Sequence, residues 1–143
     1  MTSRLRPFTS SMFTSRRLQN IKRGLYEMKR RVSGRSHQVF YFHQIDDPYS
    51  HLLVQALESV QRSYDIDLEL RIVPAPADDA APERAALEDY SRRDAAAIAS
   101  FYELRFDDPG SQPTVEICQL AERALVATGN KVAAAVEIGA ALW

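Results

Sequence analysis

The segment 39–50, with the sequence VFYFHQIDDPYS, decides the fold of this chain. Its first four residues are apolar on both faces of an extended strand, which is typical of a strand that is covered on both sides. Asp47 can cap the free N–H groups of a following helix, and Pro48 suits the first helical position. The segment therefore predicts a buried strand over 39–44 and a helix over about 48–63.

A second strand is predicted shortly after this helix. Apolar residues alternate with charged ones from Ile66 to Ile72, and Pro74 and Pro76 follow. This period of two indicates an edge strand with one face in water. A strand, a helix and a second strand form a βαβ unit over 38–76, with parallel strands and a right-handed crossover. Ligands of such sheets bind at the carboxyl ends of the strands, which here is the turn at Asp47.

The run 41–52, with Asp47-Pro48-Tyr49-Ser50 at its centre, resembles the first strand and active-site turn of the DsbA-like thioredoxin superfamily. The resemblance is to the branch of 2-hydroxychromene-2-carboxylate isomerases and kappa-class glutathione transferases. That branch carries Ser-Pro-Tyr-Ser or a similar tetrad where the redox members carry Cys-Pro-x-Cys. Pro48, Tyr49 and Ser50 match it, whereas Asp47 departs from both patterns.

The resemblance implies a site for glutathione, another small thiol or an organic acid, with isomerase or transferase chemistry rather than dithiol redox. We expect the catalytic groups at Asp47, Ser50 and His51. Asp47 and His51 are four residues apart and share a helix face, so they can form a pair for proton transfer. An ionised Asp47 donates no hydrogen bond to sulfur and repels a thiolate.

The remaining candidates at this turn carry the substrate-binding prediction. We expect Pro48, Tyr49 and His43 to contact the ligand, and we expect no metal site. A purely structural interpretation stays open beside the catalytic one. In it, Asp47 is a helix cap, His51 is its surface partner, and His43 ends the strand.

After Pro76 the sequence predicts helices and no strand. Leu87, Tyr90, Ala97, Ile98 and Phe101 share one face of a helix that extends to about Leu104. A next helix has Val115, Cys118, Ala121, Glu122 and Leu125 on one face and ends near Gly129, and a last helix covers 131–143. In the resembled family an all-helical insertion follows the first βαβ unit. We therefore expect 77–143 to be that insertion, with an incomplete sheet, and the chain to be the N-terminal part of a longer protein.

The chain has one cysteine, Cys118, which excludes an internal disulfide and a Cys-x-x-Cys pair. Its place on a predicted core face indicates an inert, buried thiol. The scarcity of cysteine favours a reducing compartment, and we expect a cytoplasmic protein, either free or associated with a membrane.

Residues 1–37 form a basic arm that holds ten Lys or Arg and one acid, Glu27. The arm carries a charge of about +9, so that the rest of the chain carries about −10. Leu18, Ile21, Leu25, Met28 and Val32 follow a three-and-four spacing and predict a basic amphipathic helix. Its stripe packs on the acidic body, docks on a membrane surface or accompanies binding to nucleic acid. The scarcity of aromatic residues disfavours nucleic acid.

Three functions remain open from the sequence. The first is a thioredoxin-like protein of the DsbA type that binds a small thiol or organic acid at Asp47. The second is a non-catalytic binding or scaffold domain of the same fold. In the third, the basic arm is the functional part and brings the domain to a membrane or nucleic acid.

Overall fold

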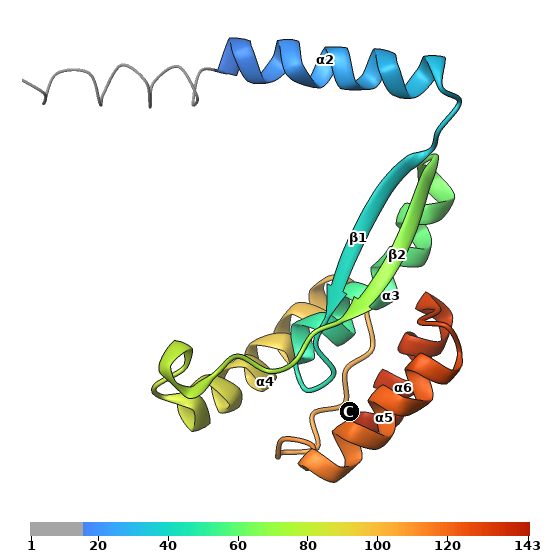
Figure 1. The fold of residues 1–143 in the computed structure, drawn as a ribbon. Helices are drawn as coiled ribbons and strands as arrows, with labels where there is room; N and C mark the ends of the chain where they lie inside the picture. The colour runs from blue at the N-terminus through green and yellow to red at the C-terminus, as the bar shows by residue number, and fades with distance from the viewer. Residues whose placement is uncertain (1–15) are drawn as a thin grey trace, which may run out of the picture. The chain divides into compact units, whose positions relative to one another are not determined.

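The computed structural model describes residues 16–143, so that residues 1–15 of the predicted arm lie outside the described part (Figure 1). The chain divides into two units between His37 and Gln38. None of the helices between residues 16 and 143 has the length and apolar content needed to cross a bilayer.

The first unit contains α2 (Arg16–Val32), which confirms the predicted basic helix. The helix ends at Val32, and Gly34 in the turn that follows has a φ of 63°, the left-handed conformation that glycine adopts without strain. The N–H of Arg35 donates to Arg30 O at 3.2 Å and that of Gly34 to Arg31 O at 3.2 Å, which pairs the last carbonyls of the helix. No residue of α2 is buried. The prediction that its apolar stripe packs on the body stays a prediction.

The second unit is an α/β structure with two parallel strands. Strand β1 (His37–His43) pairs with β2 (Ile66–Ile72), and α3 (Pro48–Ser63) connects them. The N–H of Val73 donates to His43 O at 2.9 Å at the carboxyl ends of the strands. Figure 1 shows the two strands running in the same direction with α3 on one side of them. The predicted βαβ unit is confirmed, with β1 beginning two residues earlier than expected.

The prediction that β1 is covered on both sides is wrong for the described residues. Tyr41 and His43 are buried beneath α3, whereas the side chains on the opposite face are exposed, Phe40 by 42% and Phe42 by 59%. A two-stranded sheet offers one face to α3, and the helices of the second unit do not cover the other face. The Arg71 guanidinium lies 4.4 Å from the centre of the Phe40 ring and shields part of that face.

Short 3₁₀ helix η1 (Asp78–Ala80) leads to α4 (Arg84–Phe101), α5 (Val115–Ala127) and α6 (Val132–Leu142). From residue 77 to 143 there is no strand, as predicted. The main core joins the sheet, α3, α5 and α6, and a second cluster joins α3 to α4. The main core is formed by Tyr41, Ile45, Val54, Leu57, Leu70, Ala121, Leu125, Val132 and Ala135.

Several predicted helix faces differ from the observed ones. On α4, Leu87, Tyr90 and Phe101 are exposed, and the buried residues are Ser91, Arg92, Ala95 and Ala99. Ala95 and Ala99 pack around Leu52 of α3, and their small side chains permit the close approach of the two helices. On α3, Leu53 and Val60 are exposed although they have the helical spacing of the buried Leu57, and Leu52 and Val54 are buried as well. The reason is that α3 lies between two layers and buries two faces.

On α5, Ala121 and Leu125 are buried as predicted, but Val115 is exposed. Cys118 is half-buried against the main core, and burial raises the pKa of its thiol. A thiol that stays protonated is a poor nucleophile, and the inert character of Cys118 stays a prediction. Helix α5 ends just before Gly129, as predicted, and this glycine has a φ of 72°.

Candidate functional site

The candidate site is built where β1 ends and α3 begins. The Asp47 carboxylate accepts hydrogen bonds through Oδ2 from the Ser50 N–H at 2.8 Å and from the Ser50 hydroxyl at 2.7 Å. The predicted N-cap is therefore present, with Pro48 at the first helical position. Because the Ser50 hydroxyl has one proton and donates it to Asp47, Ser50 does not offer that proton to a ligand.

The second feature of the turn is a buried chain of hydrogen bonds behind this cap. Tyr41 lies on β1, and its hydroxyl donates to the Ser50 carbonyl oxygen at 2.8 Å. His43 Nδ1 lies 3.1 Å from the same hydroxyl oxygen. Since the hydroxyl proton is already used, Nδ1 carries the proton of His43 and donates to Tyr41. The three residues fix the end of β1 against the first turn of α3.

Burial determines the protonation of this chain. It raises the pKa of Tyr41 to about 12, with the nearby Asp47 carboxylate acting in the same direction. Burial also lowers the pKa of His43 to about 4, and the nearby His51 adds to this shift. Both groups are therefore neutral at physiological pH. A neutral, buried His43 that donates to Tyr41 has the structural role that one interpretation of the sequence gave it.

The structure does not bring Asp47 and His51 together as a proton-transfer pair. Burial lowers the pKa of His51, and its Nε2 lies 3.2 Å from Arg105 O, in the loop after α4. The Gln55 amide nitrogen lies 3.1 Å from the same Nε2, so this ring nitrogen faces both a carbonyl oxygen and an amide donor. Nδ1 has no hydrogen-bond partner among the described residues and faces the backbone of α6 at Gly139. The expectation of a pair is corrected, because this face of α3 is covered by α6 and the loop.

Gln55 completes the surroundings of His51. Its amide nitrogen donates to Arg105 O at 2.8 Å, and its amide oxygen accepts from the Arg105 N–H at 2.9 Å. This two-way bond attaches the loop after α4 to α3. His51 thus belongs to a packing contact among α3, α6 and the loop, rather than to the surface where the sequence placed it.

A pocket with a cavity volume of about 270 Å³ opens at the predicted location, beside the N-terminus of α3. Asp47, Pro48 and Tyr49 line it, whereas His43, Ser50 and His51 do not. Its other walls come from the end of β1, the loop after β2, α4 and the loop before α5. These residues are Gln44, Asp46, Pro76, Ala81, Arg84, Leu87, Glu88, Ser91 and Gln112.

The polar groups of the pocket are mostly hydrogen-bond acceptors. Asp46, Asp47 and Glu88 contribute carboxylates, whereas the single cation, Arg84, bonds Asp78 at 2.9 Å and Pro76 O at 2.6 Å. Gln112 donates through Nε2 to Asp46 O at 3.0 Å, which fixes the orientation of its amide. Its Oε1 is buried and has no partner among the described residues. The site therefore suits a ligand that donates hydrogen bonds.

Tyr49 forms the wall between α3 and α4. Its hydroxyl donates to Asp94 Oδ2 at 2.7 Å, and its pKa is raised to about 12 by partial burial and by the Asp94 carboxylate. The bond holds α4 beside the mouth of the pocket. Tyr49 consequently positions α4 in addition to lining the pocket.

No protein-family model, curated protein or solved structure matches the chain. The pocket and its polar groups therefore carry the functional argument by themselves. Among residues 16–143, no cluster of three His, Cys, Asp or Glu is arranged to hold a metal ion.

The sequence did not identify the pocket walls outside the 41–52 run. Arg84, Glu88 and Ser91 have the four-and-three spacing of one helix face, and this polar stripe is a signal that sequence reading could have used. Gln112 gives no comparable signal, because it reaches the site through a loop that is distant in the sequence. Gly139 likewise gains its meaning only from its contact with His51.

Proposed function

We propose that this chain is a thioredoxin-like domain of the DsbA type that binds a small thiol compound, with glutathione as the test ligand, and performs no dithiol redox chemistry. The observation that carries the proposal is the pocket at the N-terminus of α3, whose wall includes Asp47, Pro48 and Tyr49. Pro48 and Tyr49 belong to the part of the tetrad that resembles the glutathione-dependent isomerases, and Asp47 is the position that departs from it. The strand, helix and strand around it have the order expected of that fold.

The acceptor-rich wall supports a ligand with an ammonium group. Glutathione carries one on its γ-glutamyl residue, where it can donate to Gln112 Oε1 and to the carboxylates of Asp46 and Glu88. The thiol is expected near Asp47 in its protonated form, because a carboxylate accepts from S–H and repels a thiolate. Asp47 thus changes a site for thiolate activation into one for neutral thiol binding.

The proposal is tested by calorimetric titration of the complete chain with glutathione, with S-methylglutathione and with glutathione acetylated on its amino group. We expect binding of glutathione, weaker binding of both derivatives, and affinity that falls as pH rises through the thiol pKa of about 8.5. Binding of S-methylglutathione equal to that of glutathione would contradict the role of the thiol. No heat and no thermal shift with any of the three would overturn the proposed ligand.

A substitution at the cap separates the charge of Asp47 from its structural role. In Asp47→Ser the serine can still accept from the Ser50 N–H, so α3 keeps a cap, and it offers a hydroxyl donor to sulfur. We expect stronger glutathione binding, most of all above the thiol pKa. Asp65→Ser removes the charge of an exposed acid outside the pocket by the same substitution and is the matched control. Equal gains in both variants would assign the effect to charge in general, and unchanged affinity in Asp47→Ser would show that Asp47 does not oppose the thiolate.

The second candidate is a non-catalytic binding or scaffold domain of the same fold. The Ser50 proton is committed to Asp47 and His51 is enclosed by α6, so two of the three expected catalytic groups are occupied by structural contacts. In this case Asp47→Asn and His51→Ala change stability alone. A substrate whose turnover falls in both variants, with the protein folded, would favour the enzyme instead.

A further inference from the structure

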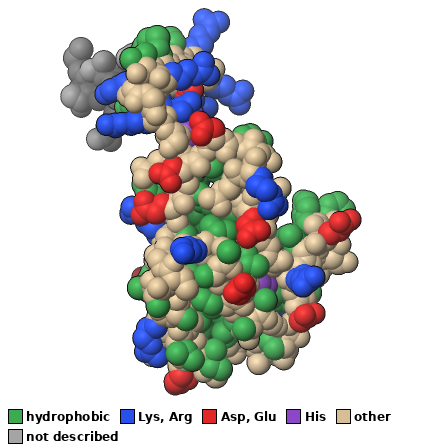
Figure 2. Space-filling view, turned by 90° about the vertical axis from the view of Figure 1, so that its right-hand side faces the viewer, with side chains coloured by type: hydrophobic (Ala, Val, Ile, Leu, Met, Phe, Trp, Pro, Cys, Tyr) green, Lys and Arg blue, Asp and Glu red, His purple; other side chains and the backbone are tan. Residues whose placement is uncertain are grey.

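The basic helix α2 lies outside the proposed ligand site and has a surface of its own. Its five apolar side chains recur every three or four residues and so lie on one side of the helix. All are exposed: Leu18 by 38%, Ile21 by 59%, Leu25 by 57%, Met28 by 60% and Val32 by 86%. We call this set the α2 stripe. Figure 2 shows basic side chains around an apolar patch over α2.

Cations border the α2 stripe on both sides. Lys22 follows Leu18 by four residues and Lys29 follows Leu25 by four, so each lysine is the neighbour of a stripe residue on the helix surface. Arg17 precedes Ile21 by four residues on the other border. Long basic side chains in such positions extend their methylene stems along an apolar surface and place their charges at its rim.

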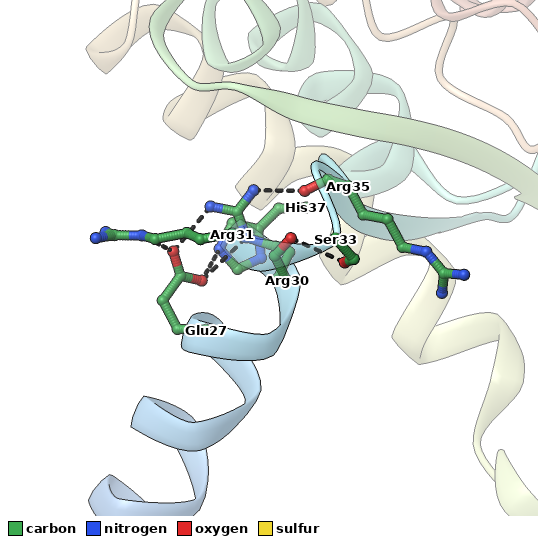
Figure 3. A network of polar contacts seen from close by, with 6 residues as sticks. All are labelled: Glu27, Arg30, Arg31, Ser33, Arg35 and His37. Atoms are coloured by element: carbon green, nitrogen blue, oxygen red, sulfur yellow. Dashed lines mark hydrogen bonds and ion pairs between the residues drawn. The ribbon is translucent and has the colours of Figure 1, made fainter.

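The one acid of the arm, Glu27, is paired with basic residues and lies away from the α2 stripe. Glu27 accepts from Arg30 at 2.8 and 3.0 Å and from Arg31 at 2.8 Å, and it lies 2.9 Å from His37 Nε2 (Figure 3). These hydrogen bonds with Arg30 and Arg31 lower the pKa of Glu27 to about 2. On a helix with 3.6 residues per turn, Glu27 lies on the side away from the α2 stripe. The acid therefore does not oppose an anionic partner on the stripe side.

The same contacts strengthen the C-terminal end of the helix. Arg30 donates to Arg35 O at 2.6 Å, and the Ser33 hydroxyl donates to Arg30 O at 2.9 Å (Figure 3). The last carbonyls of α2 are thus paired before the chain continues into β1. The helix presents its stripe in a fixed register up to Val32.

We infer that α2 docks on the surface of an anionic phospholipid membrane, with the α2 stripe at the acyl boundary and its bordering cations among the headgroup phosphates. The apolar stripe and the bordering cations together support this inference. An apolar stripe alone fits many partners, and a basic face alone fits nucleic acid. A helix with a narrow apolar stripe, a strongly cationic polar face and low mean hydropathy is the type that lies in a lipid interface. Nucleic acid would leave the five apolar side chains without a partner, and α2 has one aromatic residue, Tyr26, for stacking on bases.

The test is flotation of the complete chain with two kinds of vesicle, one of phosphatidylcholine alone and one of phosphatidylcholine and phosphatidylglycerol in equal parts. Ionic strengths of about 0.05 M and about 0.5 M separate screened from unscreened attraction. We expect binding to the mixed vesicles at low salt, weaker binding at high salt, and little binding to phosphatidylcholine. Binding that is equal for both vesicles, or absent from both, would overturn the inference.

Matched variants locate the contact on the helix. Lys22→Gln with Lys29→Gln removes two cations from the border of the α2 stripe, and Arg16→Gln with Arg23→Gln removes two from the opposite side. We expect the first pair to weaken binding by about fivefold for each lysine and the second pair to weaken it less. Equal losses in the two pairs would overturn the proposed orientation.

The apolar contact has its own pair of variants. Leu25→Gln is expected to weaken vesicle binding by about tenfold or more, whereas Leu25→Met, which stays apolar, keeps it. If the chain does not bind vesicles but slows the migration of a DNA duplex in a gel in a salt-dependent manner, α2 is assigned to nucleic acid and the membrane inference is refuted. A Leu25→Gln variant that loses thermal stability in the absence of vesicles, with no vesicle binding by the parent chain, would assign the stripe to packing and refute it equally.

Discussion

Acidification should destabilise the folded second unit through His43 before the carboxylates contribute. His43 is 3% exposed, and burial lowers its pKa from 6.5 to about 4. In the unfolded chain the imidazole is in water and binds a proton near its ordinary pKa. Between these two values the unfolded state therefore holds more protons than the folded state.

The sign and size of the effect follow from that difference. Stability rises with pH wherever the unfolded state binds more protons, so the contribution of neutral His43 is complete above about pH 6.5 and is lost as pH falls toward 4. The gap between a pKa of 6.5 and one of about 4 corresponds to about 3 kcal/mol of unfolding free energy. His51, whose pKa is also lowered by burial, acts in the same direction. The low pKa of Glu27 affects a more acidic range, below 4.5.

The assay is urea unfolding at a series of pH values from about 7.5 to about 4.5, with the parent chain and two variants. His43→Asn places an amide near Nδ1, so a donor to Tyr41 remains while the titrating group is removed. His37→Asn makes the same change at an exposed histidine of the first unit, whose side chain is 56% exposed, and is the control. We expect the pH dependence to be reduced in His43→Asn and retained in His37→Asn.

Because the chain has three histidines, each can also be followed by its own ring resonance during a pH titration. We expect the His43 resonance to remain that of a neutral ring well below pH 6.5, and its proton to lie on Nδ1. Titration of His43 near 6.5 in the folded protein would refute the argument. A His43→Asn variant with the full pH dependence of the parent would refute it as well.

Three further predictions concern the contacts that shape the site. Gly139→Ala should lower the unfolding free energy by about 1 to 3 kcal/mol, because the new Cβ overlaps His51 Nδ1 and approaches Cε1 to 3.0 Å. Gly24→Ala is the control: it has open space around it and should raise the helix content measured by circular dichroism. A Gly139→Ala variant as stable as the parent chain would contradict the packing of His51 against α6. Asp47→Ala should cost about 1 to 2 kcal/mol in urea unfolding and Asp47→Ser much less, since serine also caps; equal losses would deny the cap its role. Tyr49→Phe should lower the unfolding free energy by about 1 kcal/mol, because it removes the hydrogen bond to Asp94. Unchanged stability in both Tyr49→Phe and Asp94→Ala would show that this bond does not hold α4 in place.

The local elements of this chain were readable because each depends on signals that are adjacent in the sequence. Asp47 and Pro48 marked the start of α3 at the correct residue, and the alternation from Ile66 to Ile72 marked β2. The location of a hollow beside Asp47 followed from a general property of parallel strands, whose carboxyl ends meet at one edge. These inferences need no knowledge of which helix packs on which.

The choice of buried face was less predictable. On α4 the large residues Leu87 and Phe101 gave the stronger apolar pattern, yet the buried apolar positions are Ala95 and Ala99. Their small size lets α4 approach Leu52 closely, and a periodicity of apolar residues does not report how close two helices must come. The outer face of β1 shows the same limit, because apolar side chains at Phe40 and Phe42 predict burial wherever a covering layer exists.

The sequence alone determined the elements, the cap at Asp47 and the exclusion of a cysteine pair within this chain, because these depend on residue types and short spacings. Tertiary structure alone decided the state of the site. In the folded chain the Ser50 hydroxyl donates its proton to Asp47, and His43 forms a hydrogen bond with the Tyr41 hydroxyl. His51 packs against Gly139, which lies on a helix nearly ninety residues later in the sequence. A hydrogen bond has few partners and a packed interior has little free space, so the role of each group is set by whichever residue the fold brings against it.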